Sequence, residues 1–130
     1  MIAIDLGSNT IRFVEFDGAA WGKSFEKIVR TAEHLHQTRR IGTNAVERII
    51  NAINEAKRIF DFSQPIRAYT TAAMRLATNA DEAIAAIEQA CGITFTIIGG
   101  EKEALLTLSA VLNRLNVLGI DSSSFVLADI

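Results

Sequence analysis

The chain opens with Met1-Ile2-Ala3-Ile4-Asp5-Leu6-Gly7-Ser8-Asn9-Thr10, and this stretch decides the fold. Its first six residues are apolar and strand-like, the next four are turn formers, and residues 11–16 resume a strand-like mixture. A second turn at Asp17-Gly18 precedes residues 21–30, which are expected to form a third strand. The chain therefore begins with three strands, of which the first two form an antiparallel hairpin.

A helix is expected over residues 45–60, because Asn44 followed by Glu47 is typical of a capping box. Apolar residues repeat there at helical spacing, so one face of the helix should lie against a sheet. Residues 66–70 follow the single proline of the chain and fit a buried strand.

The second half of the chain continues this alternation. Asn79 and Glu82 repeat the capping pattern and predict a helix over residues 80–91. A strand is expected at residues 93–98, and the leucines of residues 101–118 form a continuous helical stripe.

The order of these elements predicts an α/β fold, in which a mixed sheet is covered by helices. Strands that are joined by helices should be parallel with right-handed connections, whereas the opening hairpin is antiparallel. Residues 125–130 are apolar apart from Asp129 and are expected to begin another strand. We therefore expect a domain at residues 1–124 and, at 125–130, the first strand of a second domain that is otherwise absent.

Composition limits the partners of the chain. With 130 residues, 49% hydrophobic and 22% charged, it is typical of one packed globular domain. Thirteen basic and fifteen acidic residues give a net charge of -2, so duplex nucleic acid and anionic membranes are not expected as partners. The single cysteine excludes an internal disulfide, and no apolar run approaches the roughly 20 residues of a membrane span. A cytoplasmic location is the expectation.

Three motifs suggest phosphate chemistry, and each has a structural alternative. Asp5 ends a strand and precedes a glycine turn whose amides can reach a phosphate, although a plain hairpin turn with a solvated aspartate has the same pattern. Thr70, Thr71 and Arg75 run from a strand end into a short helix and can converge on an anion. The alternative for Arg75 is a surface arginine that extends from a helix.

The third motif places Glu101 and Glu103 in the first turn of a helix, directly after Gly99-Gly100. Acidic residues there offset the helix dipole, which is the structural explanation. A glutamate at such a junction can also orient or deprotonate water for attack on phosphorus.

These motifs, in this order, resemble the exopolyphosphatase and guanosine pentaphosphate phosphohydrolase family. The family belongs to the superfamily of sugar kinases, actins and heat-shock chaperones, so the resemblance implies a ribonuclease H-like sheet, the domain I of an actin-like ATPase. It also implies a catalytic role for Glu103 and a divalent metal, Mg by family resemblance, associated with Asp129 and Asp5. The residues that it implies for phosphate binding are Gly7, Ser8, Asn9, Thr10, Thr70, Thr71 and Arg75. A glycine-rich stretch usually follows the position of Arg30 in the family, and residues 32–36 depart from it.

The resemblance implies a hydrolase that releases the terminal phosphate of polyphosphate or guanosine pentaphosphate, with water as the acceptor. The sequence does not choose between these substrates. Because a second phosphate loop and further C-terminal domains are expected beyond Ile130, the 130-residue chain alone should have little turnover. Two alternatives stay open: a non-catalytic module that binds phosphate ligands or forms a homodimer, and a phosphotransferase of the same superfamily.

Overall fold

The computed structural model describes residues 1–128, which fall into two compact units. The first unit is Met1–Ile98 and the second is Gly99–Ile130. The first unit contains a sheet and its covering helices, and the second contains one long helix.

The sheet of the first unit has five strands in the order β3-β2-β1-β4-β5. β1 pairs antiparallel with β2, and β2 with β3, whereas β4 runs parallel to both β1 and β5. The strands are β1 (Ile2–Leu6), β2 (Thr10–Phe16), β3 (Trp21–Ile28), β4 (Ile66–Thr70) and β5 (Thr96–Ile97). This mixed sheet with helical crossovers confirms the α/β fold that the order of the elements predicts, and it agrees with the ribonuclease H-like sheet that the family resemblance implies.

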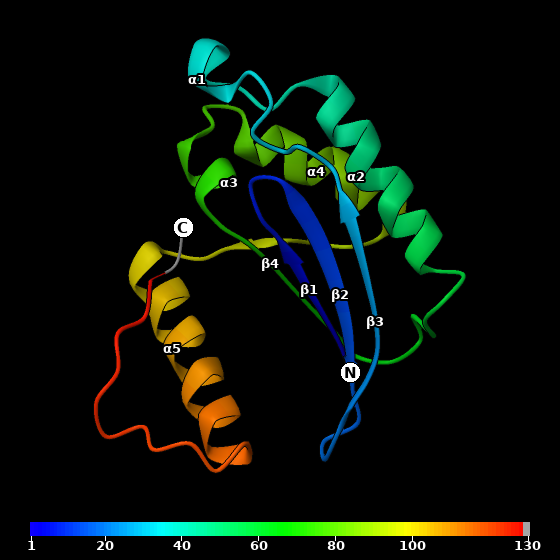
Figure 1. Ribbon diagram of the computed structural model, residues 1–130. Helices are drawn as coiled ribbons and strands as arrows, with labels where there is room; N and C mark the ends of the chain where they lie inside the picture. The colour runs from blue at the N-terminus through cyan, green and yellow to red at the C-terminus, as the bar shows by residue number, and fades with distance from the viewer. Residues whose placement is uncertain (129–130) are drawn as a thin grey trace. The chain divides into compact units, whose positions relative to one another are not determined.

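Helices α2 and α4 lie side by side against the sheet (Figure 1). The helices of this unit are α1 (Leu35–Thr38), α2 (Thr43–Ala56), α3 (Ala72–Leu76) and α4 (Ala80–Cys91). Along β1, side chains alternate between the two faces of the sheet, so Ile4 is buried while the next residue, Asp5, is exposed. One face of the sheet therefore belongs to the hydrophobic core.

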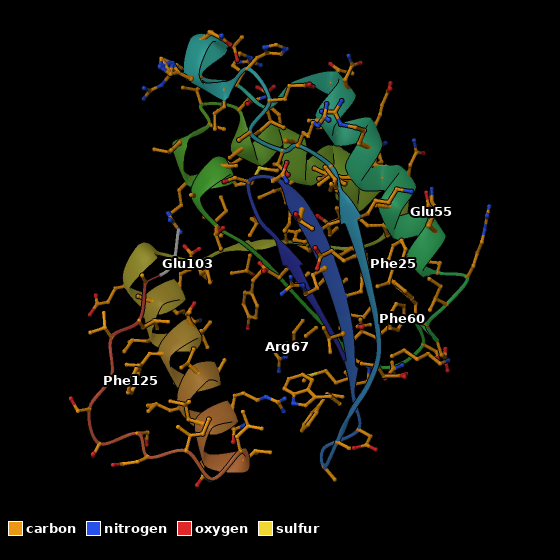
Figure 2. All side chains as sticks on the ribbon, viewed as in Figure 1. Phe25, Glu55, Phe60, Arg67, Glu103 and Phe125 are labelled. Carbon is orange, nitrogen blue, oxygen red and sulfur yellow. The ribbon has the colours of Figure 1, made fainter. Side chains whose placement is uncertain are left out.

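Phe13 of β2 lies at the centre of this core and is fully buried. Its ring centroid is 5.8 Å from that of Phe25 and 6.2 Å from that of Phe60, two of the residues labelled in Figure 2. Ile53 of α2 and Ile87 of α4 are fully buried in the same cluster. Strand and helix periodicity thus place their apolar faces in one shared core.

The second unit consists of α5 (Gly100–Val117) and the segment that follows it. The predicted leucine stripe is present, but α5 buries none of its residues. Leu105 is 58% exposed and Leu112 is 37% exposed. The apolar pattern therefore predicted the helix without predicting burial.

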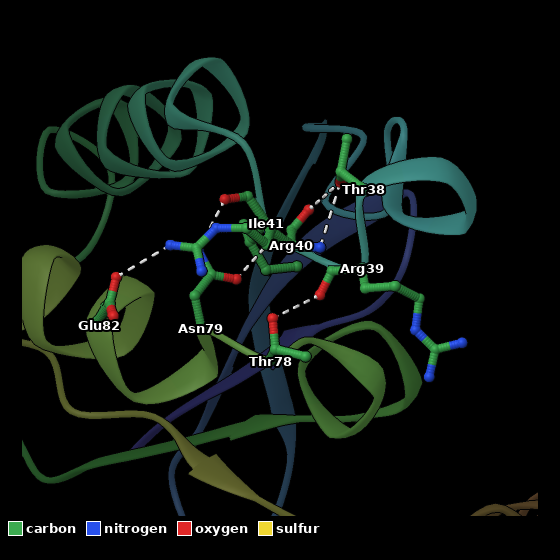
Figure 3. Close-up of polar contacts among 7 residues, drawn as sticks. All are labelled: Thr38, Arg39, Arg40, Ile41, Thr78, Asn79 and Glu82. Carbon is green, nitrogen blue, oxygen red and sulfur yellow. Dashed lines mark hydrogen bonds and ion pairs between the residues drawn. The ribbon is translucent and has the colours of Figure 1, made fainter.

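Asn79 shows why the second predicted capping box does not form, although Asn79 does occupy the N-cap of α4. Its amide group instead bonds to both sides of Ile41, accepting from the backbone nitrogen at 2.7 Å and donating to the carbonyl oxygen at 3.0 Å (Figure 3). Glu82 forms an ion pair with Arg40 at 3.3 Å. A partner 38 residues away along the chain thus replaces the local cap.

The other predicted cap, at Asn44, is also wrong. Helix α2 begins at Thr43 and has Gly42 at its N-cap, with no side-chain cap. Asn44 therefore lies inside the first turn, where its side chain cannot serve as the N-cap. The helix ends at Ala56, four residues before its predicted end at residue 60.

Two predicted strands also differ from the structure. Only Thr96 and Ile97 of residues 93–98 pair with β4, although Ile93 and Phe95 are buried. Residues 125–128 form no strand, and Asp129 lies outside the described residues. In both segments a strand was predicted from apolar character alone. A strand also requires a neighbouring strand to which its backbone can form hydrogen bonds.

The segment after β3 contains the short helix α1, for which the sequence shows no motif. None of the helices within residues 1–128 combines the length and the apolar character needed to cross a membrane. The structure confirms the opening three strands, the strand at residues 66–70 with the short helix after it, the helices at 80–91 and 101–118, and the mixed topology.

Candidate anion-binding site

The carboxyl ends of β1 and β4 meet at one edge of the sheet. Leu6 is in register with Thr70, and the Thr70 hydroxyl donates a hydrogen bond to the Leu6 carbonyl oxygen at 2.9 Å. The Ile98 amide, just after β5, donates to the Thr70 carbonyl oxygen at 3.0 Å. In open α/β sheets ligands bind outside the carboxyl ends of the strands, so this edge is where an anion site is expected.

The turn after β1 offers unbonded backbone donors at this edge. The Gly7 amide donates to the Thr10 carbonyl oxygen at 2.9 Å, which closes the turn. Ser8 and Asn9 at its tip are exposed, and neither of their amides donates a hydrogen bond within residues 1–128. Successive free amides in a turn form a concavity that binds anions.

The junction after β4 places three predicted residues at this edge of the sheet. Thr70 is fully buried and its hydroxyl proton is used within the fold, whereas Thr71 precedes α3 and is 8% exposed. Arg75, in the last turn of α3, donates from Nη1 to the Ile98 carbonyl oxygen at 2.7 Å. This bond holds its guanidinium group at the end of β5 and thus at the same edge of the sheet.

Arg75 also lines an open hollow of about 460 Å³. Polar and apolar residues share its wall, namely Met74, Arg75, Ala77, Thr78, Ala80, Asp81 and Ile97. A guanidinium group has several donors in a planar arrangement that matches phosphate oxygens. The hollow is therefore a place where an anion near Arg75 can be accommodated.

Asp5 lies on the exposed face of β1, in register with Arg12 of β2 and Tyr69 of β4. Among residues 1–128 no group of three histidine, cysteine, aspartate or glutamate side chains is placed to hold a metal ion. The other predicted metal-associated residue, Asp129, lies outside the described residues. The described residues alone therefore do not assemble a metal site.

Glu103 lies in the first turn of α5, in the second unit, and its amide donates to the Gly99 carbonyl oxygen at 3.0 Å. Glu101 shares this first turn, and both charges are favourable near the N-terminus of a helix. The structure thus confirms that both acids begin this helix, and the catalytic role of Glu103 stays a proposal.

Residues 29–32 form backbone hydrogen bonds to the turn after β1, and the sequence does not predict these contacts. The Ala32 amide donates to the Ser8 carbonyl oxygen, and the Val29 and Arg30 amides donate to the Asn9 carbonyl oxygen. No local motif predicts such contacts, because the partners are about twenty residues apart along the chain. Arg30, between β3 and α1, has a left-handed backbone with a φ of 49°, and an arginine in the sequence does not indicate this conformation.

The described geometry defines a class: a ribonuclease H-like domain with a backbone-amide turn and an arginine at the carboxyl edge of its sheet. Residues 23–130 match the model of the Ppx/GppA phosphatase family. The chain therefore belongs to the Ppx/GppA phosphatase family.

Solved structures agree with this assignment. A Ppx/GppA family member from Aquifex aeolicus superimposes with a TM-score of 0.71 at 25% identity, over 78% of this chain and 35% of that one. An exopolyphosphatase-like protein gives a TM-score of 0.67 at 27% identity, over 79% and 33% of the two chains. An exopolyphosphatase from Cytophaga hutchinsonii shares the fold, with a TM-score of 0.72 at 22% identity over 81% and 36%. The chain spans about a third of the length of these proteins.

Proposed function

We propose that the protein containing this chain hydrolyses a terminal phosphoanhydride, releasing phosphate from polyphosphate or guanosine pentaphosphate. Membership of the Ppx/GppA phosphatase family supports this reaction class. The structural observation that carries the proposal is the pair of amides at Ser8 and Asn9 that have no acceptor among residues 1–128, at the sheet edge that also carries Arg75. Such donors are suited to the oxygens of a phosphoryl group because they need no rearrangement to bind them.

In this proposal the backbone of Gly7, Ser8, Asn9 and Thr10 holds the terminal phosphoryl group. Arg75 offsets its negative charge, and the segment of Thr70 and Thr71 keeps β4 and the turn together through the bond from Thr70 to Leu6. A substrate held in this way presents its terminal phosphorus atom to water in a fixed orientation.

Glu103 is the proposed general base. It accepts a proton from water as the water oxygen forms a bond to the terminal phosphorus atom. The bond from that phosphorus to the bridging oxygen breaks, and the bridging oxygen leaves on the shortened substrate. Phosphate and a product with one phosphoryl group fewer result.

A divalent cation, Mg²⁺ by family resemblance, is also proposed for the complete protein, with Asp5 and Asp129 as the associated carboxylates. Bound near the phosphates, such a cation supplies positive charge that offsets the charge of the substrate. Removal of divalent cations with a chelator should abolish phosphate release, and readdition of Mg²⁺ should restore it. Unchanged release in the presence of chelator would reject this part of the proposal.

The decisive test is Glu103→Gln in the full-length protein, assayed for phosphate release from polyphosphate and from guanosine pentaphosphate. Loss of the general base should lower kcat by roughly 100-fold or more. Glu101→Gln is the matched control, because it removes an equal charge from the same helical turn and should change kcat little. Undiminished release by Glu103→Gln rejects the assignment.

We also propose that the 130-residue chain alone has little or no turnover, because it spans about a third of its structural relatives. The remaining donors of the phosphate clamp are proposed to come from further domains. Robust hydrolysis by the isolated chain would overturn this view.

Self-association is a second candidate, which the exposed apolar residues of α5 and the following segment favour. Leu105, Val117 and Leu118 are all more than half exposed, and exposed apolar patches often form interfaces. Sedimentation of the chain at several concentrations tests for a homodimer, and Leu105→Glu should weaken it. A strictly monomeric chain at every concentration rejects the homodimer.

A further inference from the structure

We infer that Arg48 of α2 is a positioning residue for the anion-binding turn, acting through the loop at residues 29–33. This inference rests on the proposed function of that turn. Arg48 does not contact the turn itself: it holds the loop, and the loop holds the carbonyl groups of Ser8 and Asn9.

Arg48 holds the loop at three points through one guanidinium group. Its Nε donates to the Val29 carbonyl oxygen at 2.8 Å, and its Nη2 lies 2.7 Å from Oε2 of Glu33. Nη2 also donates to the Arg30 carbonyl oxygen at 3.4 Å. Because the guanidinium group is planar and rigid, these contacts fix both ends of the loop relative to α2.

The loop in turn binds the tip of the turn through three backbone hydrogen bonds. The Ala32 amide donates to the Ser8 carbonyl oxygen at 2.9 Å. The Asn9 carbonyl oxygen accepts from the Val29 amide at 2.8 Å and from the Arg30 amide at 2.9 Å. Both carbonyl groups at the tip therefore point towards the loop.

This orientation decides where the Asn9 amide points. In a trans peptide the C=O and N–H bonds are antiparallel, and the chain has no cis peptide within the described residues. Because the Ser8 carbonyl points towards the loop, the N–H of Asn9 in the same peptide group points away from it. The loop thus fixes the direction of a donor that has no acceptor in the described part of the chain, before any ligand arrives.

Arg30 shows that the loop depends on support from outside. It has a φ of 49°, a left-handed conformation that is unfavourable for a residue with a side chain. Arg48 bonds to the carbonyl oxygens of Val29 and Arg30, one on each side of the Arg30 α-carbon. Without Arg48, the loop is expected to relax, and the two peptide groups at the tip should lose their common orientation.

The test measures binding of tripolyphosphate to the full-length protein by calorimetry. Arg48→Met keeps the aliphatic length but removes every donor, and it should raise Kd roughly 10- to 100-fold through misplaced donors. Arg48→Lys keeps the charge but cannot bond Val29 and Glu33 with one rigid group, so it should give an intermediate loss. Lys27→Met is the matched control, since Lys27 also forms an ion pair with α2, at Glu55, without touching the loop.

A second measurement separates positioning from a general loss of stability. In NMR spectra of the wild type, the Asn9 amide resonance should shift on addition of tripolyphosphate. In Arg48→Lys this shift should be smaller, while the chemical shifts of the core amides of β1 should be unchanged. Should Arg48→Met fail to fold, Arg48→Lys carries the test alone.

A wild-type protein that does not bind tripolyphosphate removes the proposed function, and this inference with it. A wild type that binds, together with Arg48 variants of equal affinity and unchanged Asn9 shifts, overturns the positioning role and leaves the proposed function intact. Weaker binding by Lys27→Met of the same size as by Arg48→Met also overturns it, because the effect would then be one of charge.

Discussion

The two units of the chain use their apolar residues differently. In Met1–Ile98, apolar side chains such as Phe13 and Ile53 are fully buried in one cluster. In the described part of Gly99–Ile130, the eighteen residues of α5 include none that is buried. Both units have the periodicity that predicts an apolar face. Periodicity therefore indicates which side chains share a face, whereas burial requires a second surface to cover it.

Their polar contacts differ in the same way. In the first unit, Arg48 and Glu33 are 15 residues apart and Asn79 and Ile41 are 38 apart. In the second unit, Asp121 accepts hydrogen bonds from the amide and hydroxyl of Ser123, only two residues away. Long-range contacts exist only in the folded chain. Substitutions in the first unit should therefore lower the free energy of unfolding far more than substitutions in the second unit.

Removal of a core ring should give the largest difference between the units. Phe13→Ala leaves a cavity in the shared core and should lower the free energy of unfolding by about 3–5 kcal/mol. Leu112→Ala, at a half-exposed position of α5, should cost less than about 1 kcal/mol. Urea denaturation followed by circular dichroism measures both, and equal losses would contradict the comparison.

Asn79→Ala tests the long-range polar contacts. It leaves the backbone amide and carbonyl of Ile41 without their partners and should cost about 1–3 kcal/mol. Asn44→Ala is the matched control, because Asn44 is exposed and is not the N-cap of α2. Asp121→Ala, which removes a contact between near neighbours, should shift the urea midpoint less than Asn79→Ala. A larger shift for Asp121→Ala would reverse the ranking of the two units.

The reaction rate of the Cys91 thiol measures how well the first unit buries this side chain. Burial raises the pKa of its thiol, and the nearby charge of Lys57 opposes this only in part. The thiol should therefore react with a disulfide reagent at pH 8 at least about tenfold more slowly than in urea. A cysteine at Val117 of α5, which is 69% exposed, should react at close to the unfolded rate in a Cys91→Ala background. Similar thiol reaction rates at residues 91 and 117 would contradict the difference in burial between the two units.

The smallest expected effect is the pH dependence of the Arg48–Glu33 pair. The hydrogen bond from Arg48 lowers the pKa of Glu33 from its ordinary value of 4.5. Because the folded pKa is the lower one, the pair stabilises the fold above about pH 4.5, and this stabilisation is lost as the pH falls through the folded pKa.

The measurement is the urea midpoint of the wild type and of Glu33→Gln between pH 7 and pH 3. The difference between them should be largest at neutral pH and disappear at the acidic end. Asp121→Asn is the counterpart from the second unit. The Ser123 amide also lowers the pKa of Asp121, but a contact over two residues partly survives unfolding, so its pH-dependent effect should be smaller. A Glu33 difference that does not change with pH would show that the ion pair does not act as described.

Much of the candidate site follows from local sequence. The strand ending at Leu6, the turn at residues 7–10 and the strand ending at Thr70 are all visible in the pattern. Once β1 and β4 are known to be parallel neighbours, their ends must share an edge, which brings the turn and Thr70 together. The loop at residues 29–33 was missed because its hydrogen bonds to Ser8 and Asn9 depend on chain folding and not on a motif.

The two capping predictions show the same limit of local motifs. Both asparagines were followed by a glutamate at the capping spacing, yet Asn79 turned to Ile41 and Asn44 lay within its helix. A side chain bonds to whichever partner the fold brings near, and for Asn79 that partner is a buried backbone that would otherwise be unpaired.

By itself, the sequence determined the order of strands and helices and the motifs at their ends, because these depend on the side-chain periodicity and turn chemistry of neighbouring residues. Only the tertiary structure decided which apolar faces are buried, which partner the Asn79 side chain bonds to, and how the Ser8 and Asn9 peptide groups are oriented. These properties depend on contacts between residues far apart along the chain, and no local pattern specifies them.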